Sequence, residues 1–179
     1  MPRTIAFLRA INVGGHTVKM DVLRRHFETL GYTDVETFIA SGNVIFETPS
    51  KNIQTLETEI ENKLREALGY EVAVFLRTER ELAGIAKFQP FPKADFEAAV
   101  AFNVAFLKKP LESPSIKKLS SLKTDIDDFH VHEREVYWLC RRKQSESTFS
   151  NAVLEKTLGV RSTLRGMSTI QKLTAKYSF

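Results

Sequence analysis

The stretch TIAFLRAINVGG, residues 4–15, opens the fold of this chain, because an apolar run at 4–8 passes directly into a glycine-rich loop. Apolar residues at helical spacing over Asp21–Leu30 then predict an amphipathic helix, which Gly31 should end. Two short β-patterned runs, Asp34–Ile39 and Val44–Glu47, are joined by Ser-Gly-Asn at 41–43 and predict a hairpin. A longer amphipathic helix over 53–68 and a buried strand over 72–76 complete the order βαββαβ.

The same order of elements is predicted again after residue 100. Residues 78–88 indicate a connecting helix, and the sequence QPFPK at 89–93 is typical of a linker. Beyond it we expect a strand at 102–107, a helix at 114–122, a hairpin of 129–131 with 136–140, a helix at 150–158 and a strand at 160–164. A terminal helix should begin at Ser168, where Ser-Thr-Ile-Gln matches a capping box.

The predicted fold is therefore α+β, with two tandem ferredoxin-like βαββαβ units and an additional C-terminal helix. The first unit should cover residues 1–77, the connecting helix and Pro-rich linker 78–100, and the second unit with its terminal helix 101–179. Both faces of the predicted strands are apolar, as Ile5 and Phe7 alternate with Ala6 and Leu8. That pattern predicts sheets covered on both sides, and it counts against an open platform on which nucleic-acid bases stack.

Composition points to a soluble globular protein. Of the 179 residues 42% are hydrophobic and 27% are charged, and no apolar run approaches the roughly 18 residues of a membrane span. The apolar start is too short for a signal peptide. A single cysteine, Cys140, excludes an internal disulfide framework and fits a reducing compartment, so we expect the cytoplasm and no membrane partner.

Positive charge gathers in the second half of the chain. Residues 1–100 carry 12 Lys/Arg against 14 Asp/Glu, a net of −2, and residues 101–179 carry 14 against 8, a net of +6, which together give the total of +4. A local positive field favours an anionic partner such as a phosphate, a nucleotide or nucleic acid. A solvated basic face is the plainer interpretation for most of these lysines.

The predicted topology brings two loops to one end of the first sheet, which is where binding residues tend to lie. Glycine N–H groups flanked by cations could hold an anion at the start of the first helix, whereas the alternative is simply two turns that need positive φ. An arginine just before the terminal helix would suit a phosphate or carboxylate if the C-terminus folds back. The candidate ligand-binding residues are Arg9, Asn12, Gly14, Gly15, Lys19, Ser41, Gly42, Asn43, Arg165 and Lys172.

Cys140 is a poor candidate nucleophile. With a two-residue turn at 133–134, the hairpin register places Asp127 opposite Cys140 and Phe129 opposite Trp138, all on one side of the sheet. His130 and His132 fall on the other side. Cys140 is thus predicted to be a core residue and not the partner of a histidine.

No other motif identifies a reaction. The loop matches neither of the standard glycine-rich nucleotide motifs, and no Ser-His-Asp order or paired carboxylates are evident. His130 and His132 could share a metal only with a third ligand, so exposed strand histidines are the favoured interpretation and no metal is predicted. His16, beside Gly15, could act as an acid or base within the loop. Whether the protein is an enzyme, with which cofactor, and in which oligomeric state all stay open.

Three segments carry a family resemblance: LRAINVGG at 8–15, MDVLR at 20–24 and SGNVIF at 41–46. Together they resemble the bacterial DUF1697 family, whose C-terminal motif Thr-x-Arg-Asn-Trp-Asn-Thr-x-x-Lys-Leu aligns with residues 163–173. Gly166, Met167 and Ser168 stand where that motif has Asn-Trp-Asn, and Ala10 stands where the family has glycine. The resemblance implies a fold but no activity.

The sequence therefore favours binding of a small anionic ligand, a class that includes phosphorylated compounds, at the two loops. One alternative is a nucleic-acid-associated protein that uses the basic C-terminal half. The other is a non-catalytic interaction module.

Overall fold

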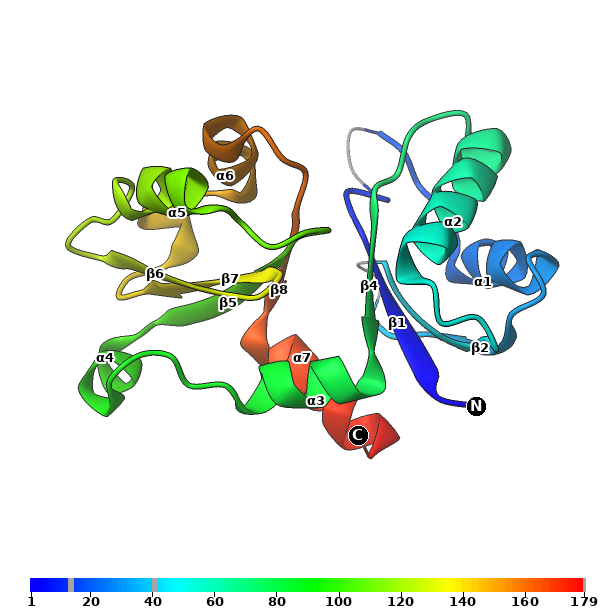
Figure 1. The fold of residues 1–179 in the computed structure, drawn as a ribbon, viewed down its shortest axis with the longest axis horizontal. Coiled ribbons are helices and arrows are strands. Elements are labelled where there is room, and N and C mark those ends of the chain that lie inside the picture. The colour runs from blue at the N-terminus through cyan, green and yellow to red at the C-terminus, as the bar shows by residue number, and fades with distance from the viewer. Residues whose placement is uncertain (13–14, 40–41, 179) are drawn as a thin grey trace. The chain divides into compact units, whose positions relative to one another are not determined.

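The computed structural model describes residues 1–12, 15–39 and 42–178 and divides them into two compact units (Figure 1). The first unit is Met1–Ala83 and the second is Gly84–Ser178. None of the helices in these ranges is long and apolar enough to cross a membrane.

The first unit is a four-stranded antiparallel sheet with helices on one face. Its strands follow the order β2-β3-β1-β4, so β1 and β2 run the same way with β3 antiparallel between them. This is the ferredoxin-like arrangement predicted from the sequence. The elements are β1 (Arg3–Leu8), α1 (Met20–Thr29), β2 (Thr33–Thr37), β3 (Asn43–Glu47), α2 (Ile53–Leu68) and β4 (Val74–Thr78), and α3 (Glu79–Lys87) follows.

The sequence explains these elements locally. Asn52 caps α2 by accepting a hydrogen bond from the Thr55 backbone N–H at 3.1 Å, and Gly69 ends the helix in the left-handed conformation at φ 80°. An unforeseen capping box opens α3: Glu81 accepts from the Thr78 N–H at 2.8 Å, and the Thr78 hydroxyl accepts from the Glu81 N–H at 3.2 Å.

Both faces of the central strand β1 are buried, as its apolar alternation predicts. Ala6 and Leu8 belong to the core that α1 and α2 form through residues such as Phe27 and Ile60. Ile5 and Phe7 point to the opposite face and are likewise fully buried. The sheet is therefore no open platform.

The second unit repeats this topology, with strands in the order β6-β7-β5-β8 and every neighbouring pair antiparallel. The fold class predicted from the sequence is thus confirmed. The elements are α4 (Lys93–Ala98), β5 (Ala101–Phe106), α5 (Ser113–Ser120), β6 (Asp127–His132), β7 (Glu135–Cys140), a 3₁₀ turn (Gln144–Glu146), α6 (Asn151–Leu158), β8 (Thr163–Gly166) and α7 (Met167–Tyr177).

Three local predictions in this region differ from the structure. The short helix α4 lies inside the stretch expected to be linker, because Pro92 provides an N-cap conformation at the start of Lys93–Ala98. Strand β8 begins at Thr163 and not at 160. The capping box expected at Ser168 does not form: α7 begins at Met167, and Gly166 caps it without a side-chain hydrogen bond.

The predicted register of the second hairpin is confirmed. Asp127 pairs with Cys140 and Phe129 with Trp138, although the turn has neither Gly nor Asn. Glu133 adopts the positive φ of 51° that the tight turn needs. Cys140 is fully buried and belongs to the same core cluster as Trp138 and Phe149.

Candidate functional site

The loop after β1 and the turn between β2 and β3 meet at one end of the first sheet. The Leu8 backbone N–H donates to the Gly42 carbonyl oxygen at 2.8 Å. Gly42 is buried with φ 83°, and a Cβ built there would lie 2.9 Å from Ile11 Cγ2 and 3.1 Å from Leu8 Cβ. The turn is therefore locked against the loop, and only glycine fits at this contact.

Asn12 helps to close the loop. Its Oδ1 accepts a hydrogen bond from the Val18 N–H at 2.8 Å. The Arg9 N–H donates to the Ala73 carbonyl, and the Tyr70 hydroxyl donates to the Ile11 carbonyl, both at 2.9 Å. Burial raises the pKa of this Tyr70 hydroxyl, which keeps it a donor. These bonds hold the loop to the end of the sheet and occupy the Asn12 carbonyl oxygen.

Asn43 is fully buried at the start of β3. Its side-chain Nδ2 donates to the Phe38 carbonyl at 2.8 Å, and its own carbonyl accepts from the Phe38 N–H at 3.0 Å. The side chain thus shapes the hairpin turn and does not reach the surface. We therefore treat Asn43 and Gly42 as the scaffold of the candidate site.

The solvent side of the loop carries the other predicted residues. Gly15 is exposed with φ 82°, Lys19 is exposed, and Arg9 is half-buried. Lys19 is also the N-cap residue of α1, and its side chain forms no capping bond. His16 stacks on the Tyr70 ring at 3.9 Å between centroids. Gly14 and Ser41 lie outside the described residues.

Arg165 and Lys172 belong to the second unit. Arg165 lies in β8 with 8% of its surface exposed, and its Nη1 donates to Thr163 Oγ1 at 2.8 Å and to the Leu164 carbonyl at 3.0 Å. Burial lowers the pKa of its guanidinium to about 10. Lys172 is exposed on α7. Arg165 thus has a buried place in its sheet that the sequence did not reveal.

The second unit contains a buried, hydrogen-bonded carboxylate that was not among the residues predicted from the sequence. Asp127 is 1% exposed and accepts hydrogen bonds from Trp138 Nε1 at 2.8 Å, from Thr124 Oγ1 at 2.8 Å and from the Ser147 hydroxyl at 2.8 and 2.9 Å. Burial alone would raise the pKa of this carboxyl, but the hydrogen bonds outweigh it and leave the pKa below its ordinary value. The sequence contained one indication of this buried carboxylate, because the predicted register placed an aspartate opposite Cys140 on the apolar face of the hairpin.

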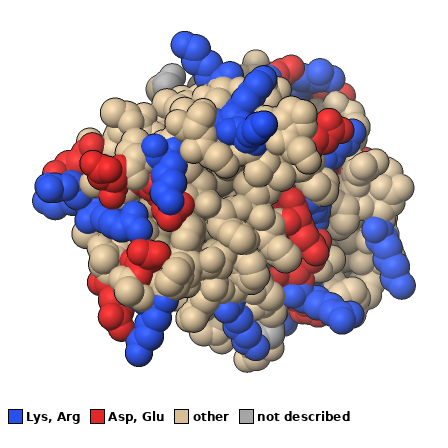
Figure 2. Space-filling view, turned by 60° about the vertical axis from the view of Figure 1, so that its left-hand side comes forward, with Lys and Arg blue, Asp and Glu red and all other residues tan. Residues whose placement is uncertain are grey.

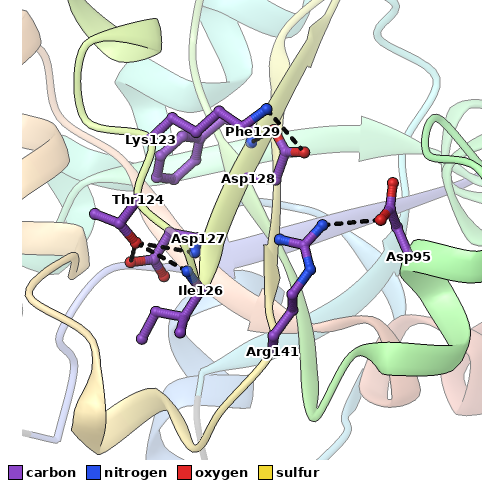
Figure 3. A network of polar contacts seen from close by, with 8 residues as sticks. All are labelled: Asp95, Lys123, Thr124, Ile126, Asp127, Asp128, Phe129 and Arg141. Atoms are coloured by element: carbon purple, nitrogen blue, oxygen red, sulfur yellow. Dashed lines mark hydrogen bonds and ion pairs between the residues drawn. The ribbon is translucent and has the colours of Figure 1, made fainter.

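Figure 3 shows this carboxylate together with two separate ion pairs around β6. Thr124 bonds Asp127, while Lys123 pairs with Asp128 at 3.5 Å and Arg141 with Asp95 at 2.9 Å. The arrangement ties the ends of the hairpin to the segments before and after it. With every oxygen of Asp127 engaged, its role is structural.

His130 and His132 lie on the other face of the hairpin, as the register predicts. Phe88 stacks on His132 at 4.5 Å and contacts His130 at 5.7 Å and Tyr137 at 5.0 Å. Burial, followed by the neighbouring His132, lowers the pKa of His130. The described residues contain no cluster of three metal-ligating side chains.

Some basic side chains of the second unit lie close to carboxylates. In the face that Figure 2 shows, blue cationic and red anionic side chains are interspersed and form no continuous basic stripe. Lys93 lies 3.8 Å from Glu97, and Arg142 lies 3.8 Å from Glu146. A nucleic-acid interface would need a contiguous cationic surface, which this face does not provide.

A family model and a solved structure are similar to this chain. A family model described as "Protein of unknown function (DUF1697)" matches residues 1–137. The solved structure of a conserved bacterial protein from Streptococcus pneumoniae is similar, with a TM-score of 0.78, 20% identity and 97% of each chain covered. At that identity the likeness concerns the fold. No curated protein matches the sequence.

Proposed function

The chain belongs to the family of proteins of unknown function DUF1697, and from that premise we propose that it binds a small anionic ligand at one end of its first sheet. The binding groups are the Arg9 guanidinium, the Lys19 ammonium and the backbone around Gly15 and the start of α1. The ligand class is a phosphate ester or another compact oxyanion, and the compartment we expect is the cytoplasm.

The junction of the two loops is the observation that carries this proposal. The bond from Leu8 to the Gly42 carbonyl and the close packing of Gly42 on Ile11 fix the base of the loop. Asn12 then closes the loop over Val18. A loop fixed at its base needs less ordering when it binds, which favours affinity for a small ligand.

The start of α1 supports an anion at this place. The first turn of a helix leaves N–H groups without intrahelical partners and carries positive dipole character. Lys19 is the N-cap residue of this helix, and its exposed ammonium adds positive charge beside these groups. Asp21 lies in the same first turn and opposes an anion.

A thermal-shift panel of nucleotides, sugar phosphates, inorganic phosphate and short RNA and DNA tests the proposal on wild type, Arg9→Ala and Lys19→Ala. A ligand at about 100 times its Kd should add roughly 2.7 kcal/mol of stability. We expect a phosphate-bearing compound to stabilise the wild type and to lose most of that effect in both variants. Asp21→Asn should strengthen it by removing an opposing charge.

Arg25→Ala, at an exposed position on α1, is the matched control and should respond like the wild type. If all three loop variants also respond like the wild type, the ligand binds elsewhere. Stabilisation by polynucleotide alone, unchanged in Arg9→Ala, would transfer the function to the basic C-terminal half.

A further inference from the structure

A cavity lies at the opposite end of the first sheet from the candidate loop. Its volume is about 410 Å³, which is within the range of pockets that hold small molecules. It forms where β1 begins, where β3 leads into α2 and where β4 ends. The residues that matter for its chemistry are Arg3, Thr4, Thr48, Lys51, Ile53 and Thr78.

Strand register brings three of its threonines to one face of the sheet. Thr4 pairs with Thr78 across β1 and β4, and with Phe46 across β1 and β3. Thr48 follows Phe46 by two residues, and so its side chain points to the same face when the strand alternation continues. Hydroxyl groups from three neighbouring chain segments thus border one cavity.

Thr4 is the informative member of this group. Only 6% of the whole residue is exposed, and its hydroxyl makes no hydrogen bond to any residue within 1–12, 15–39 and 42–178. By contrast, Thr48 Oγ1 accepts from the Ser50 N–H at 3.3 Å, and the Thr78 hydroxyl donates to Glu81 at 3.2 Å. Thr4 lines the cavity, and its hydroxyl oxygen is not among the described buried atoms that lack a partner, so it retains access to solvent there. A hydroxyl that is accessible from the cavity and has no protein partner can bond a molecule that enters it.

The charge at the rim favours an anion as that partner. Lys51 is exposed, and its ammonium makes no ion pair with any described residue. Arg3 contributes a second cation to the lining. Pro49 and Ile53 line the cavity with apolar surface, which suits the body of an organic molecule better than a bare ion.

We propose that this cavity is a second ligand site, which binds a small organic anion with its charged group near Lys51 and Arg3 and an oxygen atom within reach of the Thr4 hydroxyl. The body of the ligand packs on Pro49 and Ile53. The site is independent of the loop site, because it uses none of the same residues.

Titration of ¹⁵N-labelled protein with phenyl phosphate, inorganic phosphate and phenol tests this site by amide chemical shifts. Phenyl phosphate should give saturable shifts at Thr4, Thr48, Ser50 and Lys51, and inorganic phosphate and phenol should each bind more weakly, since each supplies half of the contacts. Shifts at Gly15 and Lys19 report the loop site separately. The failure of one site is therefore distinguishable from the failure of the other.

Two variants separate binding from folding. Lys51→Ala should weaken phenyl phosphate binding about tenfold, as expected for one charge-assisted contact. Thr4→Val should also weaken it while leaving the melting temperature unchanged or higher, because no hydrogen bond of the free protein is lost. Lys63→Ala and Thr58→Val, on α2, are the matched controls and should bind like the wild type.

Equal binding of phenol and phenyl phosphate, unaffected by Lys51→Ala, would overturn the anion site. The absence of saturable shifts at Thr4 and Thr48–Lys51 would overturn it as well. A lower melting temperature of Thr4→Val would show that its hydroxyl already has a partner in the free protein and would remove the main support.

Discussion

Arg77 in β4 pairs with Ile5 of β1, and Arg165 in β8 pairs with Val104 of β5, so each unit has a buried arginine at the same position of its sheet. In both cases Nη1 donates to the carbonyl of the preceding leucine, Leu76 at 2.8 Å and Leu164 at 3.0 Å. The repeat of topology thus extends to one detailed interaction. In the sequence, this repeated interaction corresponds to a Leu-Arg pair in each unit.

One residue further along, the two units differ. Thr4 pairs with Thr78 in the first unit, and Asn103 pairs with Gly166 in the second. Thr78 caps the helix that follows its strand, whereas Gly166 precedes α7 without any side-chain cap. Asn103 Nδ2 is buried without a hydrogen-bond partner among the described residues. The buried arginine therefore belongs to the repeated framework, while the neighbouring polar position varies between units.

The largest expected effect comes from removing the shared arginines. Arg77→Ala and Arg165→Ala should each lower the free energy of unfolding by about 3 kcal/mol, because each leaves a cavity and buried acceptors without a donor. Urea unfolding of the two variants checks this. If one of the two variants left the free energy of unfolding unchanged, the two arginines would not be equivalent.

Among the described residues of the first unit, no aspartate is buried as Asp127 is, so loss of the Asp127 network should affect the second unit alone. Asp127→Asn should cost about 2 kcal/mol at neutral pH, because a buried carboxylate with several donors becomes a neutral amide. The lowered pKa in the folded state means that this contribution is present above the ordinary value of 3.8 and is lost as the pH falls through the folded pKa. Unfolding measured from pH 7 to pH 2 should show the wild type and the variant converging in acid.

Both hairpin turns contain a residue with positive φ, which is Gly42 in the first unit and Glu133 in the second. Gly42→Ala should cost about 1–2 kcal/mol, since φ 83° and the contact with Ile11 leave no room for a Cβ. Glu133→Gly, at φ 51°, should change stability by only a few tenths of a kcal/mol, because relief of left-handed strain offsets the added chain entropy. Thermal unfolding of both variants checks this, and a tolerated Gly42→Ala would contradict the tight junction.

Helix capping gives the smallest expected effects. Thr78→Ala should destabilise by about 1 kcal/mol through loss of the capping box. Gly166→Asn should stabilise by about 0.5 kcal/mol, because it adds a capping side chain at a position with φ −64°. A Cβ there has ordinary contacts of 3.7 Å to Asn103 Oδ1 and Ser168 Oγ. Destabilisation by Gly166→Asn would mean that the glycine is required sterically.

Periodicity in the sequence was sufficient for the order of strands and helices within each βαββαβ unit, although it missed α4. It was also sufficient for the meeting of the two loops, because topology alone brings them to one end. It was also sufficient for the hairpin register that buries Cys140. It could not distinguish ligand-binding residues from scaffold. Asn12 and Asn43 were both predicted to bind a ligand, but the Asn12 side chain accepts from the Val18 N–H and the Asn43 side chain donates to the Phe38 carbonyl. The buried Arg165 and the cavity at Thr4 depend on pairing between distant strands, which a linear pattern does not contain.

The first sheet is completed early in translation, before the strands of the second unit are synthesised. All four strands of the first sheet lie before residue 79, so the partners of β1 have all been synthesised once Thr78 has left the ribosome. The last strand of the second sheet ends at Gly166, and at typical elongation rates the chain between Thr78 and Gly166 takes roughly 4–18 s, longer than most single domains need to fold. Translation thus gives the first sheet time to pair internally before the strands of the second unit can compete for its edges.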